Sequence, residues 1–223
     1  NISFNVKPKE FVGIMGASGS GKTTLLNCIS TIDKVTTGHI IINGNDITKL
    51  KGNKLNKFRR EELGFIFQDF NLLDTLTAYE NIALALTIQK VNAHEIDKRV
   101  KEIANKLDIS NILSKYPYQL SGGQKQRLSI ARSLCKKSKI ILFDEATSAL
   151  DNKSQEYIKK TIDSLVKDHT VMIVAHRLST IVDADIIHVV EKGKVVDSGM
   201  HDELLEKSEI YRSLYKTETL NSN

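Results

Sequence analysis

Residues 10–30 read EFVGIMGASGSGKTTLLNCIS, which places a glycine-rich turn between an apolar run and a helix-like stretch. The apolar run at residues 10–15 predicts a buried strand, and residues 22–30 predict a helix. Gly16 to Thr23 match the GxxxxGK[ST] phosphate loop between a strand and a helix, which is the context that this motif requires. This stretch therefore predicts an α/β fold that binds phosphate groups.

The phosphate loop has the residue types that a nucleoside triphosphate needs. Glycines allow backbone N–H groups to face phosphate oxygens, and the N-terminus of the following helix adds positive potential. Lys22 reaches the outer phosphates, and the hydroxyl of Thr23 can ligate Mg²⁺. The residues expected to bind the nucleotide are Gly16, Ala17, Ser18, Gly19, Ser20, Gly21, Lys22, Thr23 and Thr24.

Further apolar runs predict a parallel sheet. Residues 140–144 and 170–175 are mostly apolar and flank a helical pattern at residues 152–165, which is typical of a parallel sheet covered on both faces. Residues 77–113 show three- and four-residue apolar spacing and predict a helical insertion. The other expected elements are strands at residues 1–6, 38–43 and 63–67, a helix at residues 126–134, and a hairpin with arms at residues 186–190 and 194–196.

The composition is that of a globular chain that does not itself cross a membrane. With 223 residues, 40% of them hydrophobic, the chain can fill a core of its own. Its apolar runs are far shorter than the roughly 20 residues of a membrane-spanning helix. Cys28 and Cys135 have no metal-ligand spacing, which favours reduced thiols in the cytosol. No signal peptide or initiating Met is visible, so we expect the coding sequence to extend upstream.

Basic residues gather in one polar stretch although the net charge is only +5. A solvated surface loop is the simplest interpretation of such a run. Contact with acidic lipid headgroups or with nucleic acid stays open as an alternative. The residues concerned are Lys49, Lys51, Lys54, Lys57, Arg59 and Arg60.

Asp144 and Glu145 form an acidic pair at the end of the apolar run of residues 140–144. Ligands of open parallel sheets bind at the carboxyl ends of the strands, so Asp144 can hold Mg²⁺ there. Glu145 can then polarise the water that attacks the γ-phosphate. Such a pair often serves as a helix N-cap, but the phosphate loop favours the catalytic interpretation.

Leu120 to Gln124 read LSGGQ, and this pentapeptide narrows the choice of nucleotide-binding family. With five other motifs in a fixed order, it resembles the nucleotide-binding domain of ATP-binding cassette (ABC) proteins, and the resemblance covers essentially the whole chain. The other motifs are the phosphate loop, Gln68 after a strand, IILFDE at residues 140–145, SALD at residues 148–151 and His176 after a strand.

The resemblance implies a fold and its subdivision. The expected fold class is α/β, a P-loop NTPase (RecA-like) core with an antiparallel β subdomain and an inserted helical subdomain. Residues 1–223 would form a single ABC ATPase domain. Residues 1–68 and 122–223 would form the catalytic core with the β subdomain, and residues 69–121 the helical subdomain that ends in the signature motif.

The resemblance also implies ATP hydrolysis by a head-to-tail dimer. Each ATP, with Mg²⁺, would lie between the phosphate loop of one copy and the LSGGQ segment of the other. A Ser-Gly-Gly segment that opens a helix is itself a small anion site, or otherwise simply a helix cap. The implied catalytic residues are Glu145, His176 and Gln68; the residues that bind ATP in trans are Ser121, Gly122, Gly123, Gln124 and Asp151; and the metal ligands are Thr23, Gln68 and Asp144.

The implied partner is a membrane permease, contacted by helical residues between Asp69 and Leu113. The chain would then be an exporter ATPase at the cytoplasmic face of the cell membrane, either peripheral or tethered to a membrane domain, without a nucleic-acid partner. Arg127 and Arg132 are expected to be surface or interface charges. Three alternatives carry less weight: a non-transport ABC ATPase of DNA repair or translation, a GTPase suggested by the NKLD string at residues 105–108, and a module that binds ATP without turnover.

Two departures from the family pattern are visible. Adenine usually stacks on an aromatic residue well upstream of the phosphate loop, and Phe4 is too close to Gly16 to serve, so we expect weakened nucleotide affinity. Residues 46–82 resemble ATPases of peptide-antibiotic resistance and lipoprotein release. The part from Asp144 onward resembles ATPases fused behind a membrane domain, which suggests an intermediate lineage or a recombined chain.

Overall fold

The computed structural model describes residues 2–136, 138–145, 152–175 and 177–221. Its main sheet has six strands, and β8 runs antiparallel to β7 whereas the other neighbours pair in parallel. The sequence prediction of a largely parallel sheet is confirmed. In sheet order the strands are β4 (Leu63–Ile66), β5 (Ile140–Asp144), β6 (Thr170–Val174), β1 (Phe11–Met15), β7 (Ile186–Glu191) and β8 (Lys194–Gly199).

The central strands are apolar on both faces because both faces are covered. In β1, Phe11 and Met15 belong to one buried cluster, and Val12 and Ile14 belong to another. Successive side chains of a strand point to opposite faces, so this alternation assigns one cluster to each side of the sheet. Burial on both sides explains why these strands show no polar alternation.

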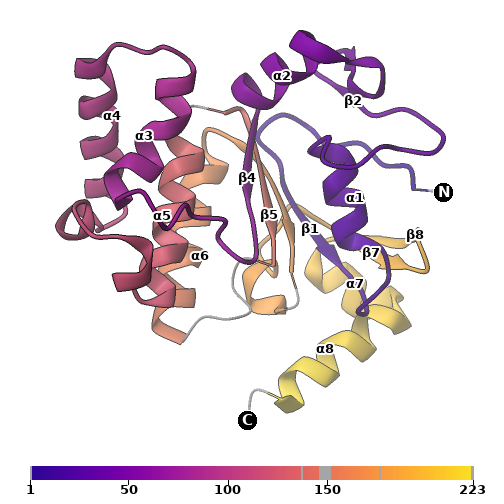
Figure 1. Cartoon of the computed structure of the whole chain (residues 1–223). Helices are drawn as coiled ribbons and strands as arrows, with labels where there is room; N and C mark the ends of the chain where they lie inside the picture. Colours follow the sequence, from indigo (N-terminus) through magenta and orange to yellow (C-terminus); the bar gives the residue numbers. More distant parts are fainter. Residues whose placement is uncertain (1, 137, 146–151, 176, 222–223) are drawn as a thin grey trace.

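Helices form a layer on each side of the sheet (Figure 1). Helix α1 (Lys22–Ile29) contacts β5 and β6 through one cluster, which contains Leu26 and Ile29. Helices α5 (Gly122–Cys135) and α6 (Asn152–Val166) contribute side chains to the second cluster, on the other face of the sheet. Helices α3 (Ala78–Ile88) and α4 (Ala93–Lys106) pack on α5. The remaining elements are α2 (Gly52–Glu61), α7 (His201–Lys207), α8 (Glu209–Asn221), the short strands β2 (Ile41–Ile42) and β3 (Asn45–Asp46), and 3₁₀ turns at Ile47–Lys49, Ser110–Ile112, Pro117–Gln119 and Leu178–Thr180.

The largest correction concerns the basic stretch, which was predicted to be a loop and forms helix α2 from Gly52 onward. Phe58 is buried and Leu55 is half-buried, whereas the surrounding polar residues are exposed. One apolar side of the helix therefore packs on the sheet layer, and the charged side chains extend into solvent from their apolar stems. The polar composition concealed this amphipathic pattern.

Three smaller predictions were wrong in their boundaries or type. Residues 2–7 form no strand although the structure describes them, and the strand expected at residues 38–43 shrinks to the two residues of β2. The helix expected at residues 126–134 begins at Gly122, since Ser121 and Gln124 form a capping box before its apolar face starts. Among the described helices, none has the length and hydropathy needed to cross a bilayer.

Candidate nucleotide site

The phosphate loop lies between the end of β1 and the start of α1, against the turn of the β7–β8 hairpin. A Cβ atom at Gly16 would lie 2.1 Å from the carbonyl oxygen of Val190, so only glycine fits without moving the backbone. Gly21 has a φ of 102°, in the left-handed region that favours glycine. The amide of Gly193 donates to the carbonyl oxygen of Ser20 at 2.9 Å. The loop is thus held by backbone contacts.

The N-terminus of α1 is open to an anionic ligand. Among the described residues, no side chain caps this helix, and its first turn contains no acidic residue. The first N–H groups of a helix have no acceptor within the helix and attract anions. Ala17, Ser18 and Gly19 are exposed at the same loop. This geometry fits the phosphates of a nucleotide.

Lys22 is folded back over the loop. Its side chain is buried, at 4% exposure, and Nζ donates to the carbonyl oxygens of Gly16 and Ala17, each at 2.9 Å. Burial lowers the pKa of Lys22, whereas the charges of Glu145 and Asp144 oppose this shift. The ammonium therefore lies among loop carbonyls and close to two acidic residues.

Thr23 and Asp144 are brought together from distant parts of the sequence. The hydroxyl of Thr23 donates to Oδ1 of Asp144 at 3.2 Å, although 121 positions separate them in the chain. Asp144 is buried, at 8% exposure. A hydroxyl and a carboxylate are oxygen ligands, which Mg²⁺ prefers, and Mg²⁺ commonly takes few protein ligands besides phosphate and water. The pair fits the expected metal site.

Glu145 adopts a strained backbone conformation directly after β5. Its φ is 48°, a region that costs a non-glycine residue about 1–3 kcal/mol. Its amide donates to the carbonyl oxygen of Val174 in β6 at 3.0 Å, so the neighbouring strand holds this conformation. Backbone strain of this kind is found at active sites as well as in turns, so it is compatible with the catalytic role expected for Glu145.

Gln68 reaches the same edge of the sheet from β4. Ile66 pairs with Phe143, the last such pair between β4 and β5. Gln68 and Glu145 each lie two residues after this pair, so they follow the same ends of the two strands. The Gln68 side chain is exposed in the turn that follows β4. The predicted residues His176 and Asp151 lie outside the described residues.

The turn after Gln68 is held by α5, a role that sequence analysis missed. The guanidinium of Arg132 donates to the carbonyl oxygens of Phe70, at 2.9 Å, and Asn71. The hydroxyl of Ser129 donates to the carbonyl oxygen of Phe70 at 3.3 Å. Phe70 and Asn71 both have positive φ values, so this turn needs external support. The spacing of Ser129 and Arg132 on one helix face was the available signal.

The LSGGQ segment opens helix α5 and caps it. The amide of Gln124 donates to Oγ of Ser121 at 3.3 Å, and the amide of Ser121 donates to Oε1 of Gln124 at 3.0 Å. Ser121 and Gly122 are exposed. The capping role considered for this segment is therefore real, and it leaves the start of the helix accessible to a ligand or a partner.

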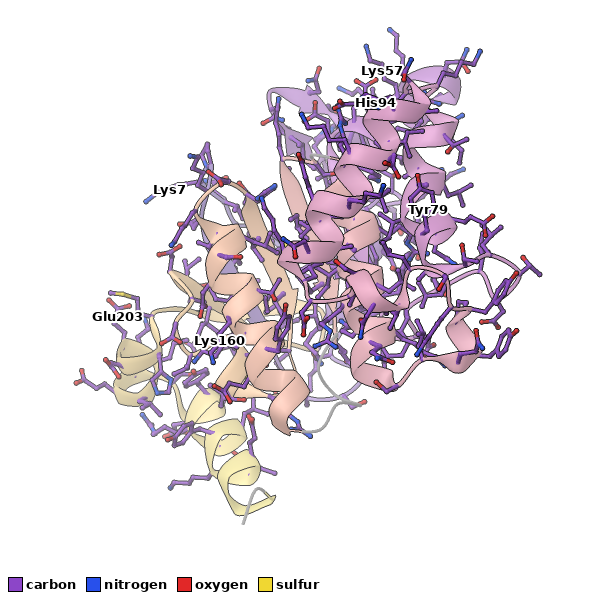
Figure 2. The ribbon with its side chains drawn as sticks, turned by 90° about the vertical axis from the view of Figure 1, so that its left-hand side faces the viewer. Lys7, Lys57, Tyr79, His94, Lys160 and Glu203 are labelled. Atoms are coloured by element: carbon purple, nitrogen blue, oxygen red, sulfur yellow. The ribbon has the colours of Figure 1, made fainter. Side chains whose placement is uncertain are left out.

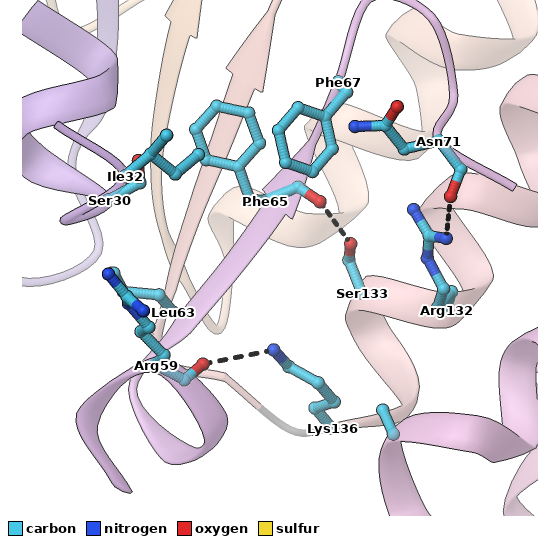
Figure 3. Close-up of a pocket in the computed structure, with 11 residues that line it drawn as sticks. Ser30, Ile32, Arg59, Leu63, Phe65, Phe67, Asn71, Arg132, Ser133 and Lys136 are labelled. Atoms are coloured by element: carbon cyan, nitrogen blue, oxygen red, sulfur yellow. Dashed lines mark hydrogen bonds between the residues drawn. The ribbon is translucent and has the colours of Figure 1, made fainter. Parts of the chain in front are cut away.

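A groove of about 580 Å³ lies beside β4 and is lined in part by residues of α2, α3 and α5 (Figure 3). The rings of Phe65 and Phe67 lie 4.2 Å apart at their centroids in its wall. Lys136 donates from Nζ to the carbonyl oxygen of Arg59 at 3.3 Å across the groove. The lining residues are Ser30, Ile32, Arg59, Leu63, Phe65, Phe67, Asn71, Ala85, Arg132, Ser133 and Lys136.

Phe4 has a packing role in the structure. Its ring lies 4.5 Å from the ring of His188 in β7, measured between centroids. Burial lowers the pKa of His188, so a neutral imidazole packs against Phe4. Weakened nucleotide affinity stays a prediction.

Comparison with known sequences identifies relatives named for export and relatives named for import. The family model described as ABC transporter matches residues 1–148. The chain is 50% identical over 177 residues to the ABC transporter ATP-binding protein YxdL of Bacillus subtilis, which covers 78% of this chain and 69% of that protein. It is 45% identical over 203 residues to the bacitracin export ATP-binding protein BceA of Halalkalibacterium halodurans, covering 86% and 80%. It is also 43% identical over 210 residues to the methionine import ATP-binding protein MetN 1 of Bacillus cereus, covering 92% and 60%.

Comparison with solved structures confirms the fold. The ATP-binding cassette MJ0796, in a dimeric post-hydrolysis state bound to ADP and Pi, superposes with a TM-score of 0.84 at 38% identity, covering 90% of this chain and 89% of that chain. With the phosphate loop, the Thr23–Asp144 pair and the LSGGQ helix in place, these matches show that the chain belongs to the ABC transporter family, as an ATP-binding subunit with ATPase activity that uses ATP and Mg²⁺.

Proposed function

We propose that this chain drives export through a membrane permease by forming a head-to-tail dimer around two ATP molecules. The hydrolytic part rests on one observation above all: Lys22, Thr23, Asp144 and Glu145 meet at one edge of the sheet. The direction is supported by BceA, whose name records export and whose length is matched over 80%, compared with 60% for the importer MetN 1.

The proposed reaction is in-line attack of water on the γ-phosphate. Lys22 leaves the carbonyl oxygens of Gly16 and Ala17 and binds phosphate oxygens, so charge that develops in the transition state meets a fixed ammonium. Glu145 orients and polarises the water as general base. Thr23 and Asp144 would hold Mg²⁺, which supplies charge neutralisation at the phosphates when bound. Gln68 and His176 would contact the metal, the water or the γ-phosphate.

The other half of each site would come from a second copy. Ser121 and Gly122 are exposed at the open end of α5, where backbone N–H groups suit a γ-phosphate. The solved cassette MJ0796 is dimeric with ADP and Pi bound, which supports this assembly. In the proposed sandwich the residues that act in trans are Ser121, Gly122, Gly123, Gln124 and Asp151.

We place the permease contact at the groove beside β4. This extends the expected contact of residues 69–113, since Asn71 and Ala85 line the groove. Its wall includes Phe67, which immediately precedes Gln68, and Arg132, which binds the turn after Gln68. A permease segment in this groove would therefore act directly on the Gln68 turn. Residues 69–121 would move as a helical subdomain against a core of residues 1–68 and 122–223.

Glu145→Gln tests the hydrolytic mechanism. We expect the variant to bind ATP, to hydrolyse it at least about 100-fold more slowly, and to accumulate as a dimer with ATP and Mg²⁺. Phosphate release and size-exclusion chromatography measure these effects. Glu102→Gln, an exposed change on α4, is the matched control and should keep the original rate. Near-normal turnover in Glu145→Gln would exclude it as the base.

Inside-out membrane vesicles that contain the chain with its permease test the direction. ATP added outside should drive substrate uptake into these vesicles if the transporter exports. ATP-dependent uptake into right-side-out vesicles loaded with ATP would instead show import and overturn the proposed direction.

A further inference from the structure

Helix α2 and the residues just before it account for the net charge of the chain. Residues 49–61 contain six cations and one acid, Glu61, so their net charge is +5, equal to that of the whole chain. The rest of the chain is therefore balanced. We call these six cations the α2 basic cluster: Lys49, Lys51, Lys54, Lys57, Arg59 and Arg60.

The charges of this cluster are largely uncompensated. Lys51, Lys54 and Arg60 are exposed, and among the described residues no carboxylate lies within salt-bridge distance of them. Lys49 pairs with Asp46 at 3.1 Å. Lys57 lies 3.9 Å from Glu61, which is a loose contact, and Figure 2 shows its side chain extending outward at one end of the molecule. An anionic surface would meet a positive field there.

Exposed isoleucines surround the same end of the molecule. Ile32, Ile41 and Ile88 are 54%, 68% and 60% exposed, and they are the exposed isoleucines of the described chain. Ile41 pairs across the β2–β3 hairpin with Asp46, which binds Lys49. One exposed isoleucine therefore adjoins the start of the cluster.

The other two isoleucines adjoin the end of the cluster. Ile32 and Arg59 line the same groove. Ile88 precedes Gln89, whose Nε2 donates to the carbonyl oxygen of Arg60 at 3.1 Å. The C-terminus of α3 therefore lies against the C-terminus of α2, as Figure 1 also shows. Cations and bare aliphatic side chains thus share one end of the molecule.

We propose that this end binds anionic phospholipid headgroups at the surface of a membrane, with the isoleucines entering the headgroup region. Clustered Lys and Arg residues near an anionic bilayer contribute about 1 kcal/mol each, and exposed apolar side chains add burial at the interface. Single-stranded nucleic acid is instead bound by cations with aromatic platforms. The aromatic residue of α2, Phe58, is buried at 8% exposure, which favours lipid.

This inference goes beyond the proposed export mechanism and does not depend on it. Arg59 and Ile32 belong both to this end and to the groove assigned to the permease, so a chain seated in a permease through that groove would turn the cluster toward the bilayer. Binding to lipid alone needs neither ATP nor permease, so its failure is distinguishable from a failure of the ATPase mechanism.

Sedimentation of the full chain with vesicles tests the proposal. Vesicles of phosphatidylcholine mixed equally with phosphatidylglycerol should carry the chain down, whereas phosphatidylcholine alone should not. Salt at about 1 M, where the Debye length is about 3 Å, should release it. Lys54→Gln/Arg60→Gln should weaken binding by about 25-fold, from two charges at about fivefold each. Ile88→Ser should weaken it further at a given salt concentration.

Matched controls distinguish binding through the α2 basic cluster from a general attraction between positive charge and the vesicles. Lys106→Gln/Lys115→Gln removes two exposed lysines elsewhere and should leave binding unchanged. ATPase activity of both double variants should equal that of the unmodified chain, which verifies folding. Equal sedimentation with both vesicle types, an unaffected Lys54→Gln/Arg60→Gln variant, displacement by inorganic phosphate at constant ionic strength, or tighter binding to an oligonucleotide than to anionic vesicles would each overturn the proposal.

Discussion

The phosphate loop and the Gln68 turn lie at the same edge of the sheet but are held in different ways. The phosphate loop is fixed by glycine conformations and by Lys22, which binds carbonyl oxygens five and six positions before it. The Gln68 turn depends on Arg132, whose guanidinium reaches Phe70 from 62 positions further along the chain. The conformation of the phosphate loop thus depends mainly on its own residues, whereas that of the Gln68 turn depends on side chains of α5.

Gly16→Ala should have the largest effect, since it disrupts the close contact between the phosphate loop and β7. The new Cβ would lie 2.1 Å from the carbonyl oxygen of Val190, so β7 or the loop must shift, at a cost of about 3 kcal/mol. Urea unfolding should show this loss together with lost ATP binding. Gly64→Ala is the control, since its Cβ would meet Ser133 at an ordinary 3.5 Å. Equal stability in both variants would show that the contact between Gly16 and Val190 does not require glycine.

Lys22→Ala should abolish most nucleotide affinity and leave the fold intact. Two charge-assisted bonds to phosphate at about 1.5 kcal/mol each amount to roughly 100-fold in dissociation constant. Titration calorimetry with ATP and Mg²⁺ measures this, with Lys34→Ala as an exposed control. Unchanged affinity would mean that Lys22 keeps its loop carbonyls when ATP binds.

Arg132→Ala should affect the Gln68 turn and spare the phosphate loop. Loss of the bonds to Phe70 and Asn71 should lower kcat by about tenfold through misplacement of Gln68, with ATP affinity unchanged. Steady-state kinetics separate the two quantities. Lys136→Ala, at the C-cap of α5, leaves the turn untouched and is the control. A fall in ATP affinity with constant kcat would show that Arg132 supports nucleotide binding and not the Gln68 turn.

Thr77→Ala should have the smallest effect. Thr77 caps α3, accepting from the amide of Glu80 at 3.2 Å in a capping box. Loss of such a cap costs about 1 kcal/mol of stability. Thermal unfolding should detect this loss while ATP binding stays constant, and Thr87→Ala at the exposed end of α3 is the comparison. A large loss of ATP affinity would show that α3 and the phosphate loop are coupled.

Sequence reasoning succeeded where the signal was local or strongly apolar. β5, β6 and α6 were predicted to within about one residue, because buried parallel strands are continuous apolar runs. It failed at α2, whose helical state depends on Phe58 meeting a neighbouring surface. It also failed at residues 2–6, where alternation suggested a strand and the structure forms none.

The sequence by itself determined the phosphate chemistry, because glycine φ values, the P-loop lysine and the helix start are all set within a few neighbouring residues. Only the tertiary structure decided which distant groups meet. The sheet order, with β6 between β5 and β1, is what brings Asp144 to Thr23. The packing of α5 on β4 brings Arg132 to the Gln68 turn, and the packing of α3 beside α2 adds Ile88 to the basic cluster. Such contacts join residues far apart in the chain, so no local pattern of sequence specifies them.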